Sequence, residues 1–316
     1  MTFIPDTGVT RRAFLAASGL ALGASLLEAQ TANGEAVIDI HQHLGYSGRT
    51  DAAFVAHQRR MGVTLTILLP AGRPMASPST HGGVSNGLEA MCRGNDACLT
   101  FARARPGAYR FAANDVPDAP GAIREIGRYL RRGALLIAEQ KFGLACDAPA
   151  MHRLYRLAEE RRVPILMHWQ FERYNYGFER FHRILARYPA VAFIGHAQTW
   201  WANIDGRHRD QSVLYPKGPV SPGGLTDRYL TDYPNLYGDL SAGSGLNALT
   251  RDEAFTRSFL ERHQNRLLFG SDCSDSEGAG DGCQGSQTLA VIRRLAPTRT
   301  IERKLLHENA RRLFEL

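Results

Sequence analysis

Two histidines, placed two residues apart, follow a short apolar run near the start of the chain. Residues 37–45 read VIDIHQHLG, and their β-branched side chains are typical of a strand buried on both faces. Side chains at positions i and i+2 of a strand point the same way, so His41 and His43 should face one side. Two neutral imidazoles that converge at a strand end can bind a metal ion. The pair alone is a weak signal, because many such pairs have no ligand role.

Later apolar runs also end in residues that can bind metals. The residues in question are Glu139, Lys141, His168, His196, Asp239 and Asp272. Buried strand ends should be apolar unless something there needs charge, because an unpaired buried charge is costly. A chance cluster of hydrogen-bonded core groups explains one or two of these positions. It does not explain ligand-type residues at the ends of so many strands, so the sequence predicts a metal site.

Short apolar strands that alternate with helices would bring these residues together. We expect strands at residues 37–45, 63–69, 109–116, 134–142, 164–169, 191–196, 236–240 and 267–272. We expect helices at residues 51–60, 86–103, 118–131, 151–160, 176–186, 252–262, 288–295 and 301–313, and a long loop at 198–224. Eight such units predict an α/β fold, a (β/α)8 TIM barrel that forms a single domain over residues 37–316. A doubly wound sheet is the rival architecture, but its G-x-G-x-x-G turn is absent after the first strand. In a barrel the carboxyl ends of the strands meet at one mouth.

The first 29 residues have the pattern of an export signal. Residues 10–15 read TRRAFL, which resembles the twin-arginine motif, and residues 13–27 carry no charge. That run is too short for a membrane-spanning helix, which needs about 20 residues, but it suits a signal peptide. We expect cleavage after Ala29, recognition by the twin-arginine export machinery, a periplasmic or otherwise exported location, and no stable membrane span afterwards.

Composition argues for a soluble globular protein that does not bind nucleic acid. The 316 residues are 44% hydrophobic and 22% charged, with a formal net charge of +7. The arginines are scattered along predicted helices without interleaved aromatics, as expected of a solvated helical surface. The composition leaves open whether the protein forms a homo-oligomer.

The five cysteines suggest one disulfide. In an oxidising compartment we expect a bond between Cys273 and Cys283, which would tie down a Gly-rich loop. Two buried free thiols are the alternative. No cysteine pair has C-x-x-C spacing, so a thiolate zinc site is not expected.

Several motifs together resemble the amidohydrolase superfamily. They are the DIHQH opening at 39–43, His168, the Gly195-His196 pair, GSD at 270–272 and LHENA at 306–310. The resemblance covers residues 37–316 and points to the amidohydrolase-related branch, which also holds the aminocarboxymuconate-semialdehyde decarboxylase type. It implies that His41, His43 and Asp272 hold one divalent metal. His168 completes that site in mononuclear members, or joins His196 on a second metal in binuclear ones.

The fourth strand leaves one ligand open. The resemblance implies a bridging carboxylate there in binuclear members, supplied by a glutamate or a carboxylated lysine. Glu139 needs no modification, and Lys141 would then neutralise it or bind an anionic substrate. A plain ion pair between the two residues is the alternative.

The expected chemistry is water activation by one or two divalent ions, with Zn²⁺ as the expected metal. Such an ion lowers the pKa of bound water towards about 7. The resemblance assigns the role of proton shuttle to Asp272. The function expected from this chemistry is hydrolysis of an amide, ester or lactone bond in a small molecule. A decarboxylase or lyase with one metal is the alternative, and it would free His196 as acid and base. A periplasmic metal- or solute-binding protein without catalysis is a third reading.

Substrate contacts are expected in the loops. Trp200 and Trp201 follow His196 and could form an aromatic wall, or could pack beneath a long loop. Arg173 could bind a carboxylate with its planar guanidinium. Asp39 is expected either to orient an imidazole N–H or to be a buried structural residue.

Overall fold

Eight short parallel strands carry the fold of the part that the computed structural model describes, residues 35–85 and 92–316. In chain order they are β1 Ile38–Gln42, β2 Leu65–Leu68, β3 Tyr109–Phe111, β4 Ile137–Gln140, β5 Ile165–His168, β6 Phe193–His196, β7 Leu236–Asp239 and β8 Leu267–Leu268. Each strand lies inside one of the ranges expected from the sequence.

Backbone hydrogen bonds close the strands into a ring. The strands pair in the orders β1-β2-β3 and β4-β5-β6-β7-β8, always parallel. A parallel bridge between Ala113 and Ile137 joins β3 to β4. On the other side, the amide of Ile40 donates to the carbonyl of Phe269, which joins β1 to the end of β8. Strand order follows chain order throughout, which is the topology of a (β/α)8 barrel.

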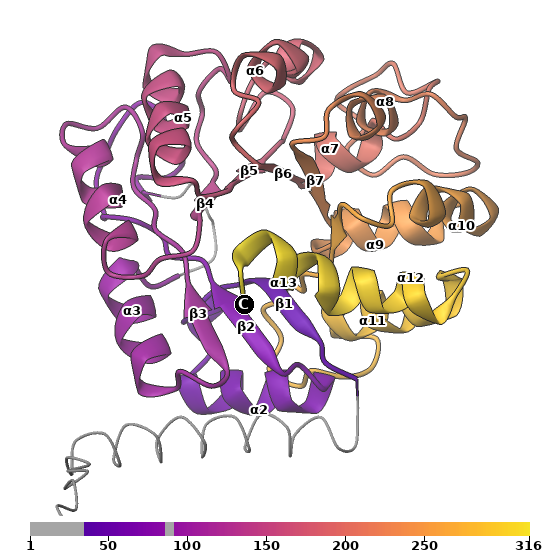
Figure 1. Cartoon of the computed structure of the whole chain (residues 1–316), viewed down its shortest axis with the longest axis horizontal. Helices are drawn as coiled ribbons and strands as arrows, with labels where there is room; N and C mark the ends of the chain where they lie inside the picture. The colour runs from indigo at the N-terminus through magenta and orange to yellow at the C-terminus, as the bar shows by residue number, and fades with distance from the viewer. Residues whose placement is uncertain (1–34, 86–91) are drawn as a thin grey trace, which may run out of the picture. The chain divides into compact units, whose positions relative to one another are not determined.

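Helices connect the strands, and Figure 1 shows most of them outside the ring. They are α2 Asp51–Met61, α3 Asn95–Ala104, α4 Ala122–Leu130, α5 Pro149–Arg161, α6 Phe181–Arg187, α7 Gln198–Ala202, α8 Leu225–Asp232, α9 Ala242–Thr250, α10 Glu253–Arg262, α11 Gln284–Leu295, α12 Arg299–Arg303 and α13 Asn309–Phe314. Short 3₁₀ helices lie at Tyr46–Gly48 and Phe178–Arg180, and a π-helical stretch at Lys304–Glu308 joins α12 to α13. No helix among the described residues is both long and apolar enough to cross a membrane.

Alternation along the strands divides the core into two apolar layers. Leu166 and Ile194 belong to a cluster built mainly from strand residues, whereas Ile165 and Met167 belong to a larger cluster that includes helix residues. His168 lies two residues after Leu166 and therefore shares its face. The histidines at these strand ends thus continue the inner layer of the barrel.

Three details differ from the sequence prediction. The helix expected at residues 86–103 begins at Asn95, with 86–91 outside the described residues. The short helix α7 opens what we expected to be a long loop, and the helices α8 and α9 were not predicted. The sequence of α9, AGSGLNALT, is rich in Gly and Ser, which disfavour helix interiors, so local propensity gave no signal for it.

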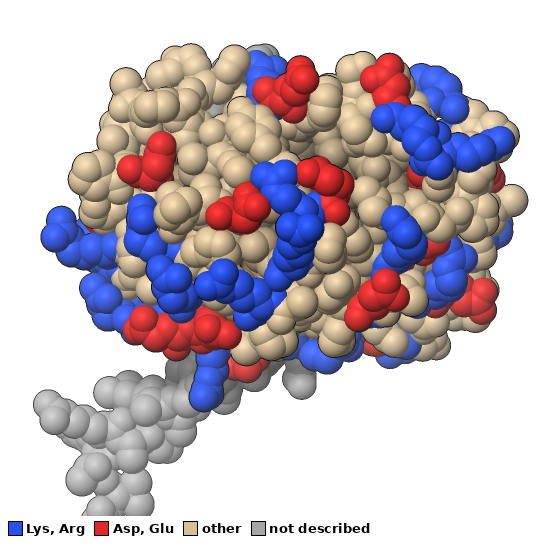
Figure 2. Space-filling model, turned by 90° about the horizontal axis from the view of Figure 1, so that it is seen from above, with Lys and Arg blue, Asp and Glu red and all other residues tan. Residues whose placement is uncertain are grey.

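Charged residues cover the surface without forming a block. In Figure 2, Lys and Arg side chains are interspersed with Asp and Glu on the face in view. Exposed ion pairs such as Arg294 with Glu253 and Arg180 with Asp147 join neighbouring elements. This mixed pattern is that of a solvated surface. The predicted signal peptide, residues 1–29, lies outside the described residues.

Candidate metal centre

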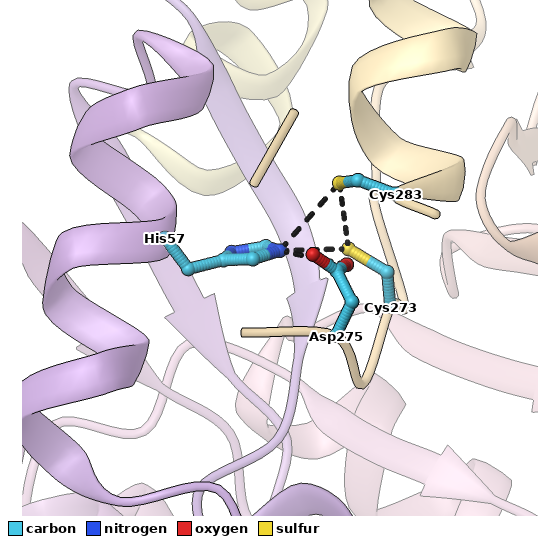
Figure 3. A group of neighbouring side chains, drawn as sticks. All are labelled: His57, Cys273, Asp275 and Cys283. Carbon is cyan, nitrogen blue, oxygen red and sulfur yellow. Dashed lines mark hydrogen bonds and ion pairs between the residues drawn. The ribbon is translucent and has the colours of Figure 1, made fainter. Parts of the chain in front are cut away.

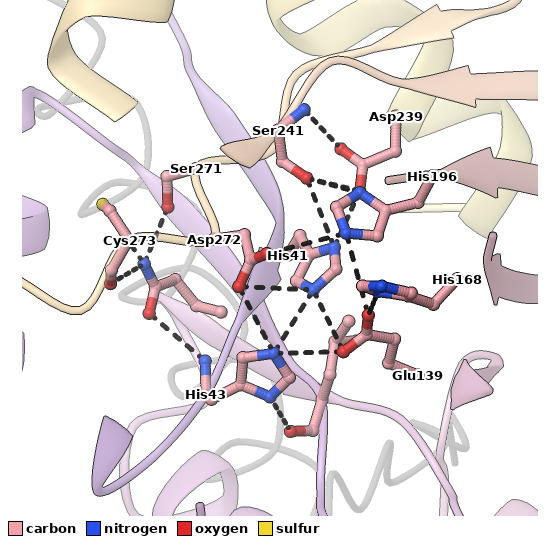
Figure 4. Close-up of polar contacts among 12 residues, drawn as sticks. His41, His43, Glu139, His168, His196, Asp239, Ser241, Ser271, Asp272 and Cys273 are labelled. Atoms are coloured by element: carbon pink, nitrogen blue, oxygen red, sulfur yellow. Dashed lines mark hydrogen bonds and ion pairs between the residues drawn. The ribbon is translucent and has the colours of Figure 1, made fainter. Parts of the chain in front are cut away.

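Six ligand-type side chains from five strand ends converge inside the barrel mouth (Figure 4). They are His41, His43, Glu139, His168, His196 and Asp272. All are buried except Asp272, whose side chain is 11% exposed. These are the six residues that the sequence predicted as metal ligands, and the structure brings them together.

One half of the centre consists of the two histidines of β1 and two carboxylate oxygens. The Nε2 atoms of His41 and His43 lie 3.3 Å apart. Asp272 Oδ1 lies 3.7 Å from the first and 3.5 Å from the second. Glu139 Oε2 lies at the same two distances. Neighbouring ligands bound at about 2.0–2.1 Å in a tetrahedron are about 3.3–3.5 Å apart, so this half fits a divalent ion.

The other half faces the second oxygen of the same glutamate. Glu139 Oε1 lies 2.5 Å from His168 Nδ1 and 3.7 Å from His196 Nε2. Asp272 Oδ2 lies 3.6 Å from His196 Nε2. The carboxylate of Glu139 therefore has one oxygen directed at each pair of imidazoles, which is the arrangement of a bridging ligand.

Several atoms at the centre are buried without a hydrogen-bond partner. Among the described residues, Glu139 Oε2, Asp272 Oδ1 and His196 Nε2 have none. Leaving such atoms unpaired costs about 1–3 kcal/mol each, so native proteins rarely keep them clustered unless something binds there. Cations in the two halves of the centre would satisfy all three, and the residues present therefore fit a metal.

Asp239, at the end of β7, fixes the orientation of two of the imidazoles. Its Oδ2 lies 2.7 Å from Nδ1 of His41 and 3.2 Å from Nδ1 of His196. Ser241 Oγ also donates to this oxygen, at 2.7 Å. A carboxylate can only accept, so each Nδ1 carries its hydrogen and each Nε2 is left as a free ligand atom directed at the centre. The sequence pointed to Asp239 as a polar strand end, but it gave no signal for Ser241.

The second histidine of β1 is oriented by the main chain. Its Nδ1 lies 2.8 Å from the carbonyl oxygen of Leu69, so the ring of His43 also presents Nε2 to the centre. The ring of Tyr46 packs edge-on against it, with centroids 5.1 Å apart. The negative charge of Asp272, followed by burial, raises the pKa of the Tyr46 hydroxyl well above its ordinary value. Tyr46 was missed by the sequence argument because it lies in a turn after the motif.

Charges at the centre favour the ligating protonation state of the β4–β5 pair. Burial alone would raise the pKa of Glu139, but the positive charge of Lys141 and hydrogen bonds from the imidazoles of His168 and His41 lower it well below its ordinary value. Burial and Lys141 lower the pKa of His168 to about 3, although Glu139 opposes this. Glu139 is therefore an ionised carboxylate and His168 a neutral imidazole.

The β1 histidines show the opposite effect. Burial would lower the pKa of His43, but its contact with Cys92 and a hydrogen bond with Asp272 raise it to about 10. Burial would also lower the pKa of His41. The negative charges of Asp272 and Asp239 outweigh burial and raise this pKa well above its usual value. The carboxylates thus make this half of the centre strongly favourable for positive charge, which a divalent ion would supply.

A glycine permits the close approach of β8 to β1. A Cβ at Gly270 would lie 2.4 Å from Asp239 Oδ1 and 2.9 Å from the Cβ of His41. Any larger residue would displace the histidine or the aspartate. The glycine of the GSD motif is therefore a packing requirement of the centre.

The two tryptophans do not form an aromatic wall. Trp200 and Trp201 are 0% and 2% exposed and belong to the hydrophobic core. A Cβ at Gly195 would meet the Trp200 ring at 2.3 Å, so the indole lies directly against β6. The indole N–H of Trp201 donates to the carbonyl oxygen of Asp239 at 3.0 Å. Both rings are therefore packed in the core, which agrees with the alternative that they lie beneath the loop.

The two predicted cationic contacts lie together beside the β5 end. Lys141 Nζ and Arg173 Cζ lie 5.5 and 5.6 Å from the centroid of the Tyr174 ring. The same tyrosine ring packs edge-on against His168 at 5.4 Å, and the guanidinium of Arg173 contacts His81 Nε2. These cations flank the centre.

Asp39 has a structural role in place of orienting an imidazole. Its Oδ1 accepts the backbone N–H of His41 and of Ser271, at 3.1 and 2.9 Å, and its Oδ2 accepts Gln58 Nε2 at 3.0 Å. Strict alternation along the strand would place its side chain on the same face as the two histidines. The register of β1 against β2 shifts between Asp39 and Gln42, and this irregularity breaks the alternation on which that expectation rested.

A cavity of about 370 Å³ opens next to the centre, beyond β5. Its lining includes Phe171, Tyr176 and Phe178 together with Gln170, and no proposed metal ligand is among the lining residues. Gln170 Oε1 lies 3.4 Å from His168 Nε2, so this side chain separates the cavity from the centre. The volume suits a small organic molecule.

Comparison with known proteins agrees with the resemblance stated from the motifs. Residues 228–316 match a family model described as amidohydrolase, and this stretch includes Asp239 and Asp272. The predicted resemblance to the amidohydrolase superfamily is thereby confirmed. A search of the curated proteins found no match.

Solved structures with the same fold span nearly the whole of this chain. An uncharacterised TIM-barrel protein from Bordetella bronchiseptica has a TM-score of 0.59 at 16% identity, covering 89% of this chain and 98% of its own. A 2,6-dihydroxybenzoate decarboxylase from Rhizobium has a TM-score of 0.58 at 15% identity, and the match covers 89% of this chain and 99% of the decarboxylase. A probable 2-pyrone-4,6-dicarboxylic acid hydrolase from Acinetobacter baumannii has a TM-score of 0.55 at 12% identity, and the match covers 89% of this chain and 99% of that protein. At these identities the likeness establishes the fold, so the predicted TIM barrel is confirmed.

Proposed function

We propose that this protein is a metal-dependent hydrolase of an amide, ester or lactone bond in a small molecule. The observation that carries the proposal is the position of Glu139. One of its oxygens lies 3.5–3.7 Å from the Nε2 atoms of His41 and His43, and the other faces His168 and His196. A carboxylate shared in this way favours two divalent ions, and sites of that type are used to attack carbonyl compounds with water.

The chain supplies a proton carrier and rigid ligands around the reacting atoms. Zn²⁺ or a similar ion, when bound, would polarise a carbonyl group and acidify water. Asp272 is the one partly exposed carboxylate of the centre, and the charge and hydrogen bonding of the β1 histidines, against burial, lower its pKa to about 2. It is therefore ionised at neutral pH, and it can accept the proton of an attacking water and return it to the leaving group. Asp239 keeps His41 and His196 in the orientation this requires.

The substrate we propose carries an anionic group. Lys141 and Arg173 flank Tyr174 on the side of the centre nearest the cavity, where they could bind a carboxylate. The names of the decarboxylase from Rhizobium and of the probable hydrolase from Acinetobacter baumannii both specify a carboxylated ring. Small lactones or amides bearing a carboxylate are therefore the first compounds to test.

Decarboxylation is the second candidate, and the fold likeness to a 2,6-dihydroxybenzoate decarboxylase favours it. In that reaction one ion would use His41, His43, His168 and Asp272, and His196 would act as acid and base. The geometry supports a single-metal site less well, because Nδ1 of His168 contacts Glu139 Oε1 and is not directed at the β1 histidines. Binding without catalysis is the remaining alternative.

A turnover screen of the metal-loaded protein separates these functions. Carboxylated lactones, amides and esters would be assayed for hydrolysis, and hydroxybenzoic acids for release of carbon dioxide. We expect hydrolysis that Asp272→Asn abolishes, with Asp227→Asn, a carboxylate that pairs with Arg262 and His263 and not with residues of the centre, as the control. Carbon dioxide release without hydrolysis would replace the proposal with the decarboxylase. No turnover of any compound at full metal loading would favour the binding protein.

We also propose that residues 1–29 direct export by the twin-arginine route, so that the mature barrel acts outside the cytoplasm. The proposal rests on the TRRAFL motif and the uncharged run that follows it. Replacing Arg11 and Arg12 by lysine should retain the protein in the cytosolic fraction. Unchanged export of that variant would contradict the assignment.

A further inference from the structure

A second cluster of ligand-type side chains lies where α2, the loop after β8 and the start of α11 meet (Figure 3). It consists of His57 on α2, Cys273 and Asp275 in the loop after β8, and Cys283 at the start of α11. Both cysteines are free, with sulfurs 3.7 Å apart. The disulfide expected between them is therefore not formed in this structure.

The distances within the cluster are those of a tetrahedral zinc site. His57 Nε2 lies 3.3 Å from Cys273 Sγ, 3.6 Å from Cys283 Sγ and 3.1 Å from Asp275 Oδ2. Tetrahedral Zn²⁺, with bonds of about 2.3 Å to sulfur and about 2.0 Å to nitrogen and oxygen, requires S···S near 3.8 Å, S···N near 3.5 Å and N···O near 3.3 Å. We infer that these four residues bind a structural Zn²⁺, separate from the metal centre of the barrel.

Hydrogen bonding among the four side chains is a poor substitute for a metal. A neutral imidazole nitrogen either donates one hydrogen or accepts one, yet Nε2 of His57 faces two sulfurs and an oxygen. The other nitrogen of this ring, Nδ1, has no partner among the described residues. The histidine is fully buried, as is Cys283, and Cys273 is 3% exposed. Four ligand atoms that surround one buried point are best satisfied by a cation.

Neighbouring groups hold the ligands in the orientation that a metal needs. Asp275 Oδ1 accepts the backbone N–H groups of Glu277 and Gly278 at 2.9 and 2.8 Å, which leaves Oδ2 directed at the cluster. The backbone N–H of Ser286 donates to Cys283 Sγ at 3.4 Å, an interaction that stabilises a thiolate. These contacts fix two of the ligands on rigid backbone.

Charge also balances at this site. Two thiolates and one carboxylate carry three negative charges, and Zn²⁺ leaves one. The buried guanidinium of Arg49 donates through Nη1 to the carbonyl oxygen of Asp275 at 2.7 Å, so it lies close enough to offset that charge. All four positions are taken by protein ligands, which is the closed coordination of a structural zinc site and not the open one of a catalytic site.

The proposed zinc would stabilise the loop that carries a ligand of the barrel centre. Cys273 follows Asp272 directly, and Gln42, between the two β1 histidines, donates through Nε2 to the carbonyl oxygen of Cys273 at 3.0 Å and to Ser271 Oγ at 2.8 Å. Fixing Cys273 therefore fixes the backbone of Asp272. Asp272 has a φ of +43°, a conformation that needs support from its surroundings.

Cobalt substitution tests the inference, because none of the six proposed ligands of the barrel centre is a sulfur. Cys92, which lies beside His43, is replaced by serine in a parallel sample so that its thiol cannot supply the signal. The full-length protein would be loaded with Co²⁺ in place of Zn²⁺ and its absorption spectrum recorded. We expect a thiolate-to-cobalt charge-transfer band in the near ultraviolet, present in His41→Ala and lost in Cys283→Ser. The matched control is Cys146→Ser, which changes another buried thiol, one that donates to Gly177 and not to this cluster.

X-ray absorption at the zinc edge of the wild-type protein gives the same answer without any variant. Sulfur neighbours at about 2.3 Å are expected. A zinc environment of nitrogen and oxygen alone, or a cobalt spectrum without the thiolate band, would overturn the inference. A Cys273–Cys283 disulfide found by non-reducing peptide mapping of the purified protein would overturn it as well.

Discussion

Asp272 and Cys273 are neighbours in the chain, yet they belong to two clusters with opposite designs. The barrel centre is built from strand ends, uses only nitrogen and oxygen, and retains one partly exposed carboxylate. The loop cluster comes from a helix and a loop, includes two sulfurs, and is filled by four protein ligands. An open set of hard ligands suits water and substrate, whereas a closed sulfur-containing set suits stability. The account therefore predicts that damage to one affects activity and damage to the other affects folding.

The largest effect should follow from removing the proton carrier. Asp272→Asn keeps the size of the side chain but removes the base, and general acid–base catalysis contributes about 10²–10⁴-fold. We expect kcat to fall by about 10³-fold, with the melting temperature nearly unchanged. Steady-state kinetics and metal analysis of the same preparation check this. A variant that keeps more than a few per cent of activity would contradict the role of Asp272.

Loss of the carboxylate that orients two imidazoles should have an intermediate effect. Asp239→Asn weakens the hydrogen bonds to Nδ1 of His41 and His196, and such partners typically affect metal affinity by about 10–100-fold. Competition with a chelator measures the affinity, and activity should return when excess metal is added. Activity that stays low at saturating metal would show that Asp239 does more than position the ligands.

The loop cluster should reverse the pattern. Cys283→Ser is expected to lower the melting temperature by on the order of 10 °C, because a tightly bound ion stabilises only the folded state. Turnover of the remaining folded protein should fall less than about tenfold. Calorimetry of the Cys283→Ser and His41→Ala variants side by side tests the contrast. Equal losses of stability would remove the distinction between the two clusters.

The smallest effect concerns a histidine–carboxylate pair that binds no metal in this account. Asp227 accepts from His263 at 2.6 Å and from Arg262 at 3.1 Å, so its oxygens already have partners. Burial would raise the pKa of Asp227, but hydrogen bonds and charge from these partners lower it below its ordinary value. Asp227→Asn should cost about 1–3 kcal/mol of unfolding free energy at pH 7, with activity intact.

The pH dependence of that cost follows from the sign of the shift. A carboxyl whose pKa is depressed by folding contributes stability above its unfolded pKa of about 3.9, and this contribution is lost as the pH falls through the folded value. The difference in stability between the wild type and Asp227→Asn should therefore be constant near neutrality and shrink below about pH 4. Denaturant titrations across this range measure it. A difference that grows towards low pH would contradict the assignment.

Sequence reasoning reached the strands and the ligand types for a clear physical reason. Buried parallel strands are short apolar runs, and polar residues such as His168 and His196 at their ends conflict with burial unless they have a partner. The role of Asp39 was left open between orienting an imidazole and a structural residue, because alternation assumes an unbroken strand and the register shift in β1 cannot be read from the sequence. The tryptophans could not be placed either, since an indole suits a core or a wall equally well.

The loop cluster shows the limit of spacing as a guide. Cys273 and Cys283 are 10 residues apart, and His57 lies 216 residues before Cys273. No local pattern links such positions. The sequence argument used C-x-x-C spacing as its criterion and therefore did not expect a thiolate zinc site. Only the closure of the barrel, which packs α2 against the loop after β8, brings these residues together.

Metal content of the barrel centre tests the central claim most directly. Because the loop cluster would add an ion of its own, the measurement uses full-length Cys283→Ser, in which only the centre should count. We predict two ions per chain, falling to about one when Glu139→Gln is added, with loss of hydrolysis. One ion per chain with Glu139 intact and hydrolysis retained would contradict the bridging role of Glu139 on which the account rests.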